Sequence, residues 1–138
     1  MKVRDVMTPD PIAIRSDRTI RDALETLEKH HIRHLPILED GRLSGILSDR
    51  SVAPWRQTLF DAESWHDVDL EALLMQTRVA DIVERRVVSI DPDAPVSAAI
   101  DALLDHNIGA VPVVDDRDEL VGIVSYVDLL RAMRSLVD

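Results

Sequence analysis

The stretch Leu120-Val121-Gly122-Ile123-Val124-Ser125 decides the fold, because an earlier stretch, Leu43-Ser44-Gly45-Ile46-Leu47-Ser48, is a close copy of it. The preceding segment is duplicated too, since His34-Leu35-Pro36-Ile37-Leu38-Glu39-Asp40 returns as Ala110-Val111-Pro112-Val113-Val114-Asp115-Asp116. So is Val3-Arg4-Asp5-Val6-Met7, which returns as Val79-Ala80-Asp81-Ile82-Val83. A long period that occurs twice predicts two copies of one supersecondary unit. Neither copy alone is long enough for a sound core, so we expect the two to pack together and leave a seam suited to a ligand.

Composition restricts the classes of protein to which the chain can belong. The 138 residues are 46% hydrophobic and include no cysteine, which excludes a disulfide, a thiolate nucleophile and a cysteine metal site. The formal net charge of -10 argues against a nucleic-acid-binding surface, which needs a concentrated basic face. No apolar run approaches the roughly 20 residues that cross a bilayer, and the N-terminus lacks a signal-peptide pattern. We therefore expect one compact domain in a cytoplasmic protein.

The pattern within each repeat alternates between short strands and helices. In the first repeat, Ile12-Ala13-Ile14 is predicted to be a strand, Thr19 begins a helix that ends near His30 and His31, and strands at 34–39 and 43–47 flank a turn. The second repeat has the same order: a strand at 88–90, a helix from about Pro95 to Asp105, strands at 110–114 and 120–124, and a final helix from Ser125. Each repeat is predicted to be a small sheet covered by helices on one side.

The segment from about Pro54 to Thr77 differs in composition from both repeats. It holds Trp55, Phe60, Trp65 and an acidic run, and Leu70, Leu73 and Leu74 indicate a helix in its second half. Its aromatic side chains either pack this connector onto the domain or belong to a subunit interface. We divide the chain into a first repeat at 1–54, a connector at 55–77 and a second repeat with a C-terminal helix at 78–138, together forming one compact module.

The repeated elements resemble a known family. An apolar strand with Pro near its start, a turn, and then Gly122-Ile123-Val124-Ser125-Tyr126-Val127-Asp128 is similar to the cystathionine β-synthase (CBS) domain, and two copies resemble the tandem pair called a Bateman module. The similarity covers about residues 3–52 and 79–130. It implies an α/β (α+β) fold of two pseudo-symmetric CBS repeats packed sheet to sheet. It also implies a regulatory module that binds AMP, ADP or ATP, less often S-adenosylmethionine or a dinucleotide, in clefts between the repeats.

The second repeat carries the fuller ligand pattern of this family. The resemblance implies that the Ser125 hydroxyl contacts phosphate or ribose and that the Asp128 carboxylate, with its two acceptor oxygens, receives the ribose diol. Ser125 also begins a helix, where free N–H groups favour an anion. In another interpretation, Ser125 only caps the helix and Asp128 complements its positive end. The expected adenine pocket, which also suits an ordinary core, comprises Val88, Val111, Pro112 and Val113, with Ala110 beside it.

The first repeat departs from this pattern, because Ser51 stands where the second repeat has Asp128. A single hydroxyl cannot accept from two ribose hydroxyls, so we expect two unequal sites. The first repeat instead supplies Arg33 and His34, where related modules place phosphate-contacting residues, with Arg50 near them. We expect Arg33 and His34 to face the Ser125/Asp128 cleft across the seam, the alternative being solvated surface groups. The remaining candidate ligand-binding residues are Ile12, Leu35, Pro36 and Ser48.

A metal site and a catalytic site are the two alternatives to this nucleotide site. His30, His31 and His34 are close in sequence, but the run crosses a helix end into a strand, which argues against a metal site. The four glycines do not form a Gly-x-Gly-x-x-Gly or Walker loop, and no Gly-x-Ser-x-Gly motif occurs, so we expect neither an enzyme nor a cofactor.

We therefore predict a module that senses an adenine nucleotide and relays its occupancy to a protein partner. Apolar residues of the last helix indicate a homodimer: Leu129, Leu130, Met133, Leu136 and Val137. The alternative is a structural interaction module with the same fold and no ligand. The Ser125/Asp128 pair favours sensing, and the Ser at position 51 favours the structural module.

Overall fold

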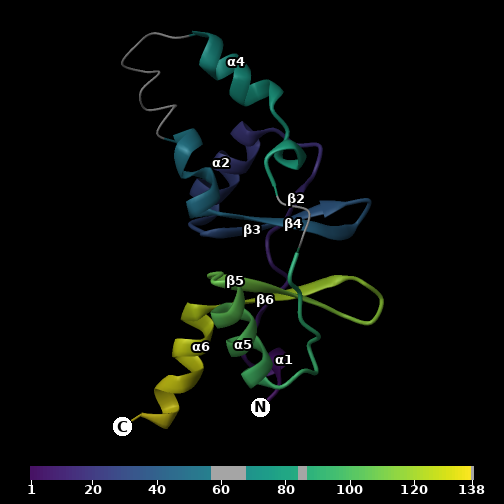
Figure 1. Cartoon of the computed structure of the whole chain (residues 1–138), viewed down its shortest axis with the longest axis vertical. Helices are drawn as coiled ribbons and strands as arrows, with labels where there is room; N and C mark the ends of the chain where they lie inside the picture. The colour runs from purple at the N-terminus through teal and green to yellow at the C-terminus, as the bar shows by residue number, and fades with distance from the viewer. Residues whose placement is uncertain (57–67, 84–86, 138) are drawn as a thin grey trace. The chain divides into compact units, whose positions relative to one another are not determined.

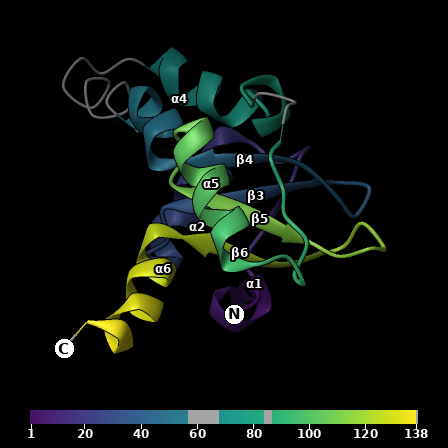
Figure 2. The ribbon, with the colours of Figure 1, turned by 60° about the horizontal axis from the view of Figure 1, so that its bottom comes forward.

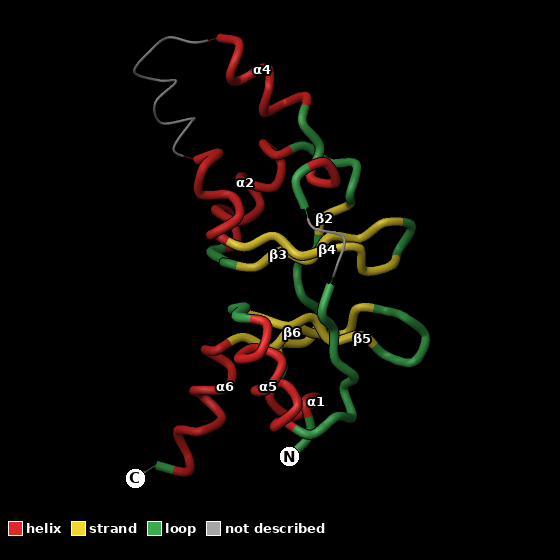
Figure 3. Tube along the Cα trace, in the orientation of Figure 1, coloured by secondary structure: helices red, strands yellow, loops and turns green. Residues whose placement is uncertain are grey.

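Two compact units make up the computed structural model, which describes residues 1–56, 68–83 and 87–137. The second-repeat unit contains Met1–Ile12, Asp40–Leu43 and Arg86–Asp138, and the first-repeat unit contains Ala13–Glu39 and Ser44–Arg85 (Figure 1). The chain folds into two three-stranded sheets with their helices, as the duplication predicts. The alternation of helices and strands along the chain can be followed in Figure 3.

The first-repeat sheet has the strand order β2-β3-β4, with β2 parallel to β3. Helix α2 begins at Thr19, where the Thr19 side chain accepts from the Asp22 N–H and Asp22 accepts from the Thr19 N–H. The helix ends at His31, which adopts a left-handed conformation with φ of 52°. The elements are β2 (Ile14–Arg15), α2 (Ile20–His30), β3 (His34–Glu39), β4 (Arg42–Ser48), a helical segment at 49–56, α4 (Val68–Gln76) and η1 (Val79–Asp81).

The second-repeat sheet has the order β1-β6-β5 and is antiparallel throughout. Helix α5 crosses over the strands of this sheet (Figure 2), and its inward residues Ala99 and Leu103 join Val111, Val113 and Val124 in the core. The elements are α1 (Val3–Val6), β1 (Thr8–Pro9), α5 (Val96–His106), β5 (Ala110–Val114), β6 (Leu120–Ser125), α6 (Tyr126–Met133) and η2 (Arg134–Leu136).

Each unit takes its first short helix from the other repeat of the sequence. In both units this segment is held by the same set of backbone hydrogen bonds. The bonds of the second-repeat unit are Val3 N–H to Ala94 O at 2.9 Å, Arg4 N–H to Pro92 O at 2.9 Å and Val96 N–H to Met1 O at 3.1 Å. Those of the first-repeat unit are Val79 N–H to Arg18 O at 2.8 Å, Ala80 N–H to Ser16 O at 3.2 Å and Ile20 N–H to Thr77 O at 2.9 Å.

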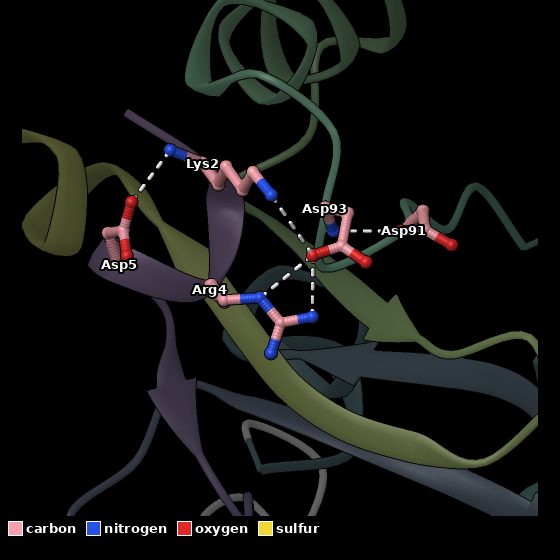
Figure 4. Close-up of polar contacts among 5 residues, drawn as sticks. All are labelled: Lys2, Arg4, Asp5, Asp91 and Asp93. Atoms are coloured by element: carbon pink, nitrogen blue, oxygen red, sulfur yellow. Dashed lines mark hydrogen bonds and ion pairs between the residues drawn. The ribbon is translucent and has the colours of Figure 1, made fainter.

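Charged side chains also hold the N-terminal segment in the second-repeat unit (Figure 4). Arg4 donates from Nε and Nη2 to Asp93 Oδ1 at 2.9 and 2.6 Å. Lys2 Nζ lies 3.8 Å from the same oxygen. The hydrogen bond from Arg4 holds the pKa of Asp93 below its usual value, although all three side chains are exposed.

Gly122 allows the N-terminal segment to approach β6 closely. A Cβ placed on Gly122 would collide with Met7 Sδ and lie 3.1 Å from the carbonyl oxygen of Thr8. The register of the sheet pairs Thr8 with Ile123 and Pro9 with Gly122. The missing side chain therefore lets β1 lie at the edge of the second-repeat sheet.

Some elements differ from those predicted. The strand expected at 12–14 is observed at Ile14–Arg15, and the strand expected at 88–90 reduces to a single bridge between Ile90 and Val113. The connector contains α4, and Trp55 is half-buried against the core of the first-repeat unit. Phe60 and Trp65 lie outside the described residues. The predicted domain boundaries at 54 and 78 stay a prediction. In the structure, residues 1–12 belong to the second-repeat unit, although they lie within the first repeat of the sequence.

Candidate functional site

Ser125 and Asp128 form a reciprocal cap at the start of α6. The Ser125 N–H donates to Asp128 Oδ2 at 2.9 Å, and the Asp128 N–H donates to Ser125 Oγ at 3.3 Å. The Ser125 hydroxyl also donates to Asp128 Oδ2, at 3.0 Å. The two residues therefore cap α6, and any ligand must bind to side chains that already interact.

Backbone donors at this helix start are partly in use. The Tyr126 N–H donates to Gly109 O at 3.3 Å, and the Asp128 N–H is taken by Ser125. The start of α6 therefore offers an anion fewer free N–H groups than an uncapped helix start would. The cause is the capping box itself, together with the turn at Gly109 before β5.

Thr8 is a member of this cluster that the sequence pattern did not indicate. Its hydroxyl donates to Asp128 Oδ1 at 3.0 Å, across 120 positions of sequence. Thr8 comes from β1, whose pairing with β6 brings it to the start of α6, where Asp128 lies. A two-residue strand has no hydrophobic periodicity, so only its pairing partner could have revealed it.

The expected adenine pocket of the second repeat lies largely on β5, whose residues alternate between two faces. Val111 and Val113 are fully buried in the core of the unit, and Val88 packs against that core. Ala110 and Pro112 are also buried, and strand geometry directs them to the opposite face. Ala110 and Pro112 are therefore outside the core cluster that encloses the two valines.

The corresponding cap of the first repeat uses two hydroxyls. The Ser48 N–H donates to Ser51 Oγ at 2.8 Å, and the Ser51 N–H donates to Ser48 Oγ at 3.2 Å. The Ser51 hydroxyl donates in turn to Ser48 O at 2.9 Å. Ser51 therefore replaces the carboxylate of Asp128 as a capping group without supplying a second acceptor oxygen.

Arg33 and His34 lie at the start of β3 in the first-repeat unit. Arg33 is exposed, and its carbonyl accepts from the Asp49 N–H at 3.0 Å. It lines a groove of about 490 Å³ in which Arg56 pairs with Asp49 at 3.2 Å. The groove residues are Leu27, Glu28, His31, Ile32, Arg33, Asp49 and Arg56. The basic neighbour of Arg33 in this groove is thus Arg56, where the sequence suggested Arg50.

His34 is half-buried, and this burial lowers its pKa. The Asp49 carboxylate acts in the opposite direction and the Arg33 charge in the same direction as burial. Since the pKa lies below 6.5, His34 is mostly neutral at pH 7. A cationic role for His34 is therefore expected only at lower pH than an unperturbed histidine would allow.

The remaining candidates divide between the two units. Leu35 and Pro36 are buried in β3, Ser48 ends β4, and Ile12 is 36% exposed in the second-repeat unit. The expected approach of Arg33 and His34 to Asp128 across a seam stays a prediction. Among the three neighbouring histidines, His30 ends α2, His31 follows it in a left-handed conformation and His34 begins β3. The described residues contain no group of three or more His, Asp or Glu side chains arranged to hold a metal ion.

Comparison with known proteins identifies the two repeats. The chain matches the family model of the CBS domain over residues 3–55 and 79–135. The chain belongs to the CBS domain family. The two matches make it a tandem CBS pair, or Bateman module, that covers nearly the whole sequence.

Relatives of this CBS pair include proteins of similar length and longer enzymes. A CBS domain-containing protein of Dictyostelium discoideum is 33% identical over 129 residues, which are 93% of this chain and 88% of the relative. The L-aspartate semialdehyde sulfurtransferase of Methanocaldococcus jannaschii is 33% identical over 132 residues, or 94% of this chain and 22% of that enzyme. The chain therefore spans about a fifth of the length of this longer relative.

A solved structure of a similar chain has the same fold and contains bound ligands. The CBS domain pair of protein MJ0100, in complex with 5′-methylthioadenosine and S-adenosyl-L-methionine, is 30% identical to this chain. Its TM-score is 0.77, and the alignment covers 99% of this chain and 98% of that one. In the described part of this CBS pair, no helix has the length and apolar character needed to span a membrane.

Proposed function

We propose that this CBS pair is a regulatory module that binds an adenosine-containing ligand and relays its occupancy to a protein partner. The candidates are AMP, ADP and ATP, with S-adenosylmethionine as a further one. The observation that carries the proposal is the cluster of Thr8, Ser125 and Asp128 at the start of α6. The ligands of the MJ0100 domain pair, both of which contain adenosine, support it.

The chemistry of the cluster suits a nucleoside. Asp128 is half-buried and presents a carboxylate, which accepts hydrogen bonds from ribose hydroxyls more strongly than a neutral oxygen does. The Ser125 oxygen accepts from the Asp128 N–H with one lone pair, and this bond leaves the hydroxyl hydrogen free to turn. That hydrogen can therefore turn from Asp128 toward a ligand oxygen. Ala110 and Pro112 are the apolar residues proposed to contact the base, and both side chains are buried in this structure.

The phosphate of a nucleotide needs positive groups that the start of α6 does not supply in full. Arg33 is the phosphate-contacting residue that we propose for the first repeat, because its side chain is exposed and its planar fork matches phosphate geometry. At a net charge of -10, the protein repels a polyphosphate at long range, so such short-range contacts must dominate. The proposal also includes that this chain has no catalytic activity of its own.

A structural interaction module is the second candidate function. It is favoured by the exposed apolar residues of α6 and the segment after it, where Leu130 is 65% exposed and Leu136 78% exposed. Such a surface suits a permanent contact with another chain. In that case the cap at Ser125 and Asp128 would serve stability alone.

Calorimetry separates the two functions. Wild-type protein is titrated with AMP, ADP, ATP, S-adenosylmethionine and NAD, and the best ligand is then tested on Asp128→Ala. Loss of charge-assisted hydrogen bonds, worth about 1.5 to 3 kcal/mol, should weaken binding roughly 10- to 100-fold. Ser51→Ala, which removes the equivalent cap of the first repeat, is the matched control. Unchanged affinity in a folded Asp128→Ala protein contradicts the proposal.

A further inference from the structure

The Asp128 carboxylate is nearly saturated by donors of its own chain. A carboxylate has two oxygens and about four lone-pair positions for hydrogen bonds. Oδ2 accepts from the Ser125 N–H at 2.9 Å and from the Ser125 hydroxyl at 3.0 Å. Oδ1 accepts from the Thr8 hydroxyl at 3.0 Å. One position on Oδ1 therefore stays available, whereas a vicinal diol needs two.

The three intrachain donors differ in how easily they can leave. The Ser125 N–H belongs to the helix cap and is fixed by the backbone. The Ser125 hydroxyl can turn toward a ligand while still accepting from the Asp128 N–H. The Thr8 hydroxyl can turn its hydrogen away too, but its oxygen stays beside Oδ1, because a β-branched side chain has few preferred rotamers.

Thr8 is held in place by its backbone. Its strand pairs with β6 in the register of Thr8 with Ile123, and Met7 packs on Gly122 directly before it. The Met7 N–H donates to Val3 O at 2.9 Å, and Val3 is fully buried. The hydroxyl therefore stands beside Asp128 before any ligand arrives.

We infer that Thr8 is a specificity-determining residue of the site, because its hydroxyl competes with one ribose hydroxyl for Oδ1 of Asp128. The inference rests on the proposed function, since it concerns how that site reads a ribose. While both hydroxyls stay bonded to Asp128, the carboxylate has one free acceptor position, so the second ribose hydroxyl must displace the hydroxyl of Thr8 or that of Ser125. The site should accordingly tolerate the loss of one ribose hydroxyl better than an unobstructed carboxylate would.

The test compares Thr8→Val with wild type. Valine has nearly the shape of threonine and suits a strand, and Thr8 is exposed, so the substitution removes the hydroxyl with little effect on packing. AMP, 2′-deoxy-AMP and 3′-deoxy-AMP are titrated by calorimetry into each protein. The measured quantity is the ratio of the Kd of each deoxy form to the Kd of AMP. A ratio cancels general effects of the substitution on the site.

We expect this ratio to rise about 3- to 10-fold in Thr8→Val for at least one deoxy form, because the freed acceptor position now rewards the intact diol. Thr8→Ser, which restores a hydroxyl, should return the ratio to the wild-type value. An unchanged or smaller ratio in Thr8→Val, with AMP still bound by the wild type, overturns the role of Thr8 and leaves the proposed function intact. Absence of binding of AMP, ADP, ATP and S-adenosylmethionine to the wild type at millimolar concentration overturns both.

Discussion

The side chain of Val83 lies over the backbone of Gly45. A Cβ placed on Gly45 would collide with Val83 Cγ1 and lie 3.6 Å from Ile37 Cδ1. Val83 follows η1, the segment that the first-repeat unit takes from the start of the second repeat. Glycine at position 45 therefore makes room for the segment that completes this unit.

Gly45→Ala should destabilise the protein by about 1 to 3 kcal/mol, as overpacking commonly does. Val83 is β-branched and stiff, so it cannot turn away from the new methyl group. Urea unfolding of Gly45→Ala, Val83→Ala and the double variant measures the coupling between the two sites. The double variant should be more stable than the sum of the single effects implies. Additive effects would show that the two side chains do not meet. Gly41→Ala, at a glycine with φ of 79° and no atom near its Cβ, is the control, and its cost should not depend on Val83.

Arg4→Gln should raise the pKa of Asp93 toward its usual 3.8, because the hydrogen bond from Arg4 is the main cause of the lowered value. A carboxylate with a lowered pKa in the folded state stabilises the protein above its unfolded pKa. That contribution is lost as the pH falls through the folded pKa. Titration of the side-chain carboxyl by NMR measures the shift. Asp17, whose pKa is lowered by a hydrogen bond from Arg15, should titrate identically in both proteins. A stationary Asp93 in Arg4→Gln would mean that the pair does not form in solution.

His34→Gln should flatten the pH dependence of stability on the acidic side of neutrality. Burial lowers the pKa of His34 in the folded state, so between that value and 6.5 the unfolded chain binds more protons. Stability is therefore full above about pH 6.5 and falls as the pH drops toward the folded pKa. Unfolding free energies measured from pH 7.5 to 5 give the slope. His106→Gln controls for the loss of one imidazole. The same slope in wild type and His34→Gln would contradict the assignment.

Ser51→Asp should give the first repeat a carboxylate at the position that Asp128 occupies in the second. The cap should survive, because an Asp at this position accepts from the Ser48 N–H as Asp128 does from the Ser125 N–H. Made in an Asp128→Ala background, the change isolates the first site, and calorimetry should detect nucleotide binding roughly 10- to 100-fold tighter than in that background. Ser51→Asn, which caps without a charge, should gain much less. No gain at all would mean that the two sites differ by more than this residue.

The protein should be a homodimer through the apolar surface of α6. Exposed residues there include Val127, Leu130 and Met133, and Leu136 follows in η2; each is close to half exposed or more. Light scattering at tens of micromolar should give a dimer mass for wild type and a monomer mass for Leu130→Glu. Leu73→Glu, the same change on α4, should stay dimeric. A monomer mass for wild type, with and without nucleotide, would refute the prediction.

The duplication predicted the parts of the fold that depend on local pattern. The strands His34–Glu39 and Ala110–Val114 are observed at the predicted positions, and the capping box of Thr19 and Asp22 begins α2 as expected. In each case neighbours in sequence supply the signal. The family assignment followed from the same repeated elements.

Long-range pairing accounts for what the sequence did not reveal. Thr8 reaches Asp128 only because β1 joins β6, and nothing near Thr8 in the sequence indicates that contact. Which arginine lies beside Arg33 also depends on three-dimensional geometry, in this case on the faces of a helix. Asp49 and Arg56 are separated by two helical turns and share one face, whereas Arg50 is rotated by about 100° from Asp49. Arg56 therefore lines the groove beside Arg33, and Arg50 does not.

The exchange of first helices between the repeats constrains how the chain can fold during its synthesis. Residues 79–83 complete the first-repeat unit, so that unit stays open until the ribosome has passed the connector. Residues 3–9 are synthesised before β6 and α5, the elements with which they pair. This segment therefore stays unpaired until the second repeat has been made, and neither unit can close before residues of both repeats are present. We expect residues 3–9 to be exposed to chaperones during this interval.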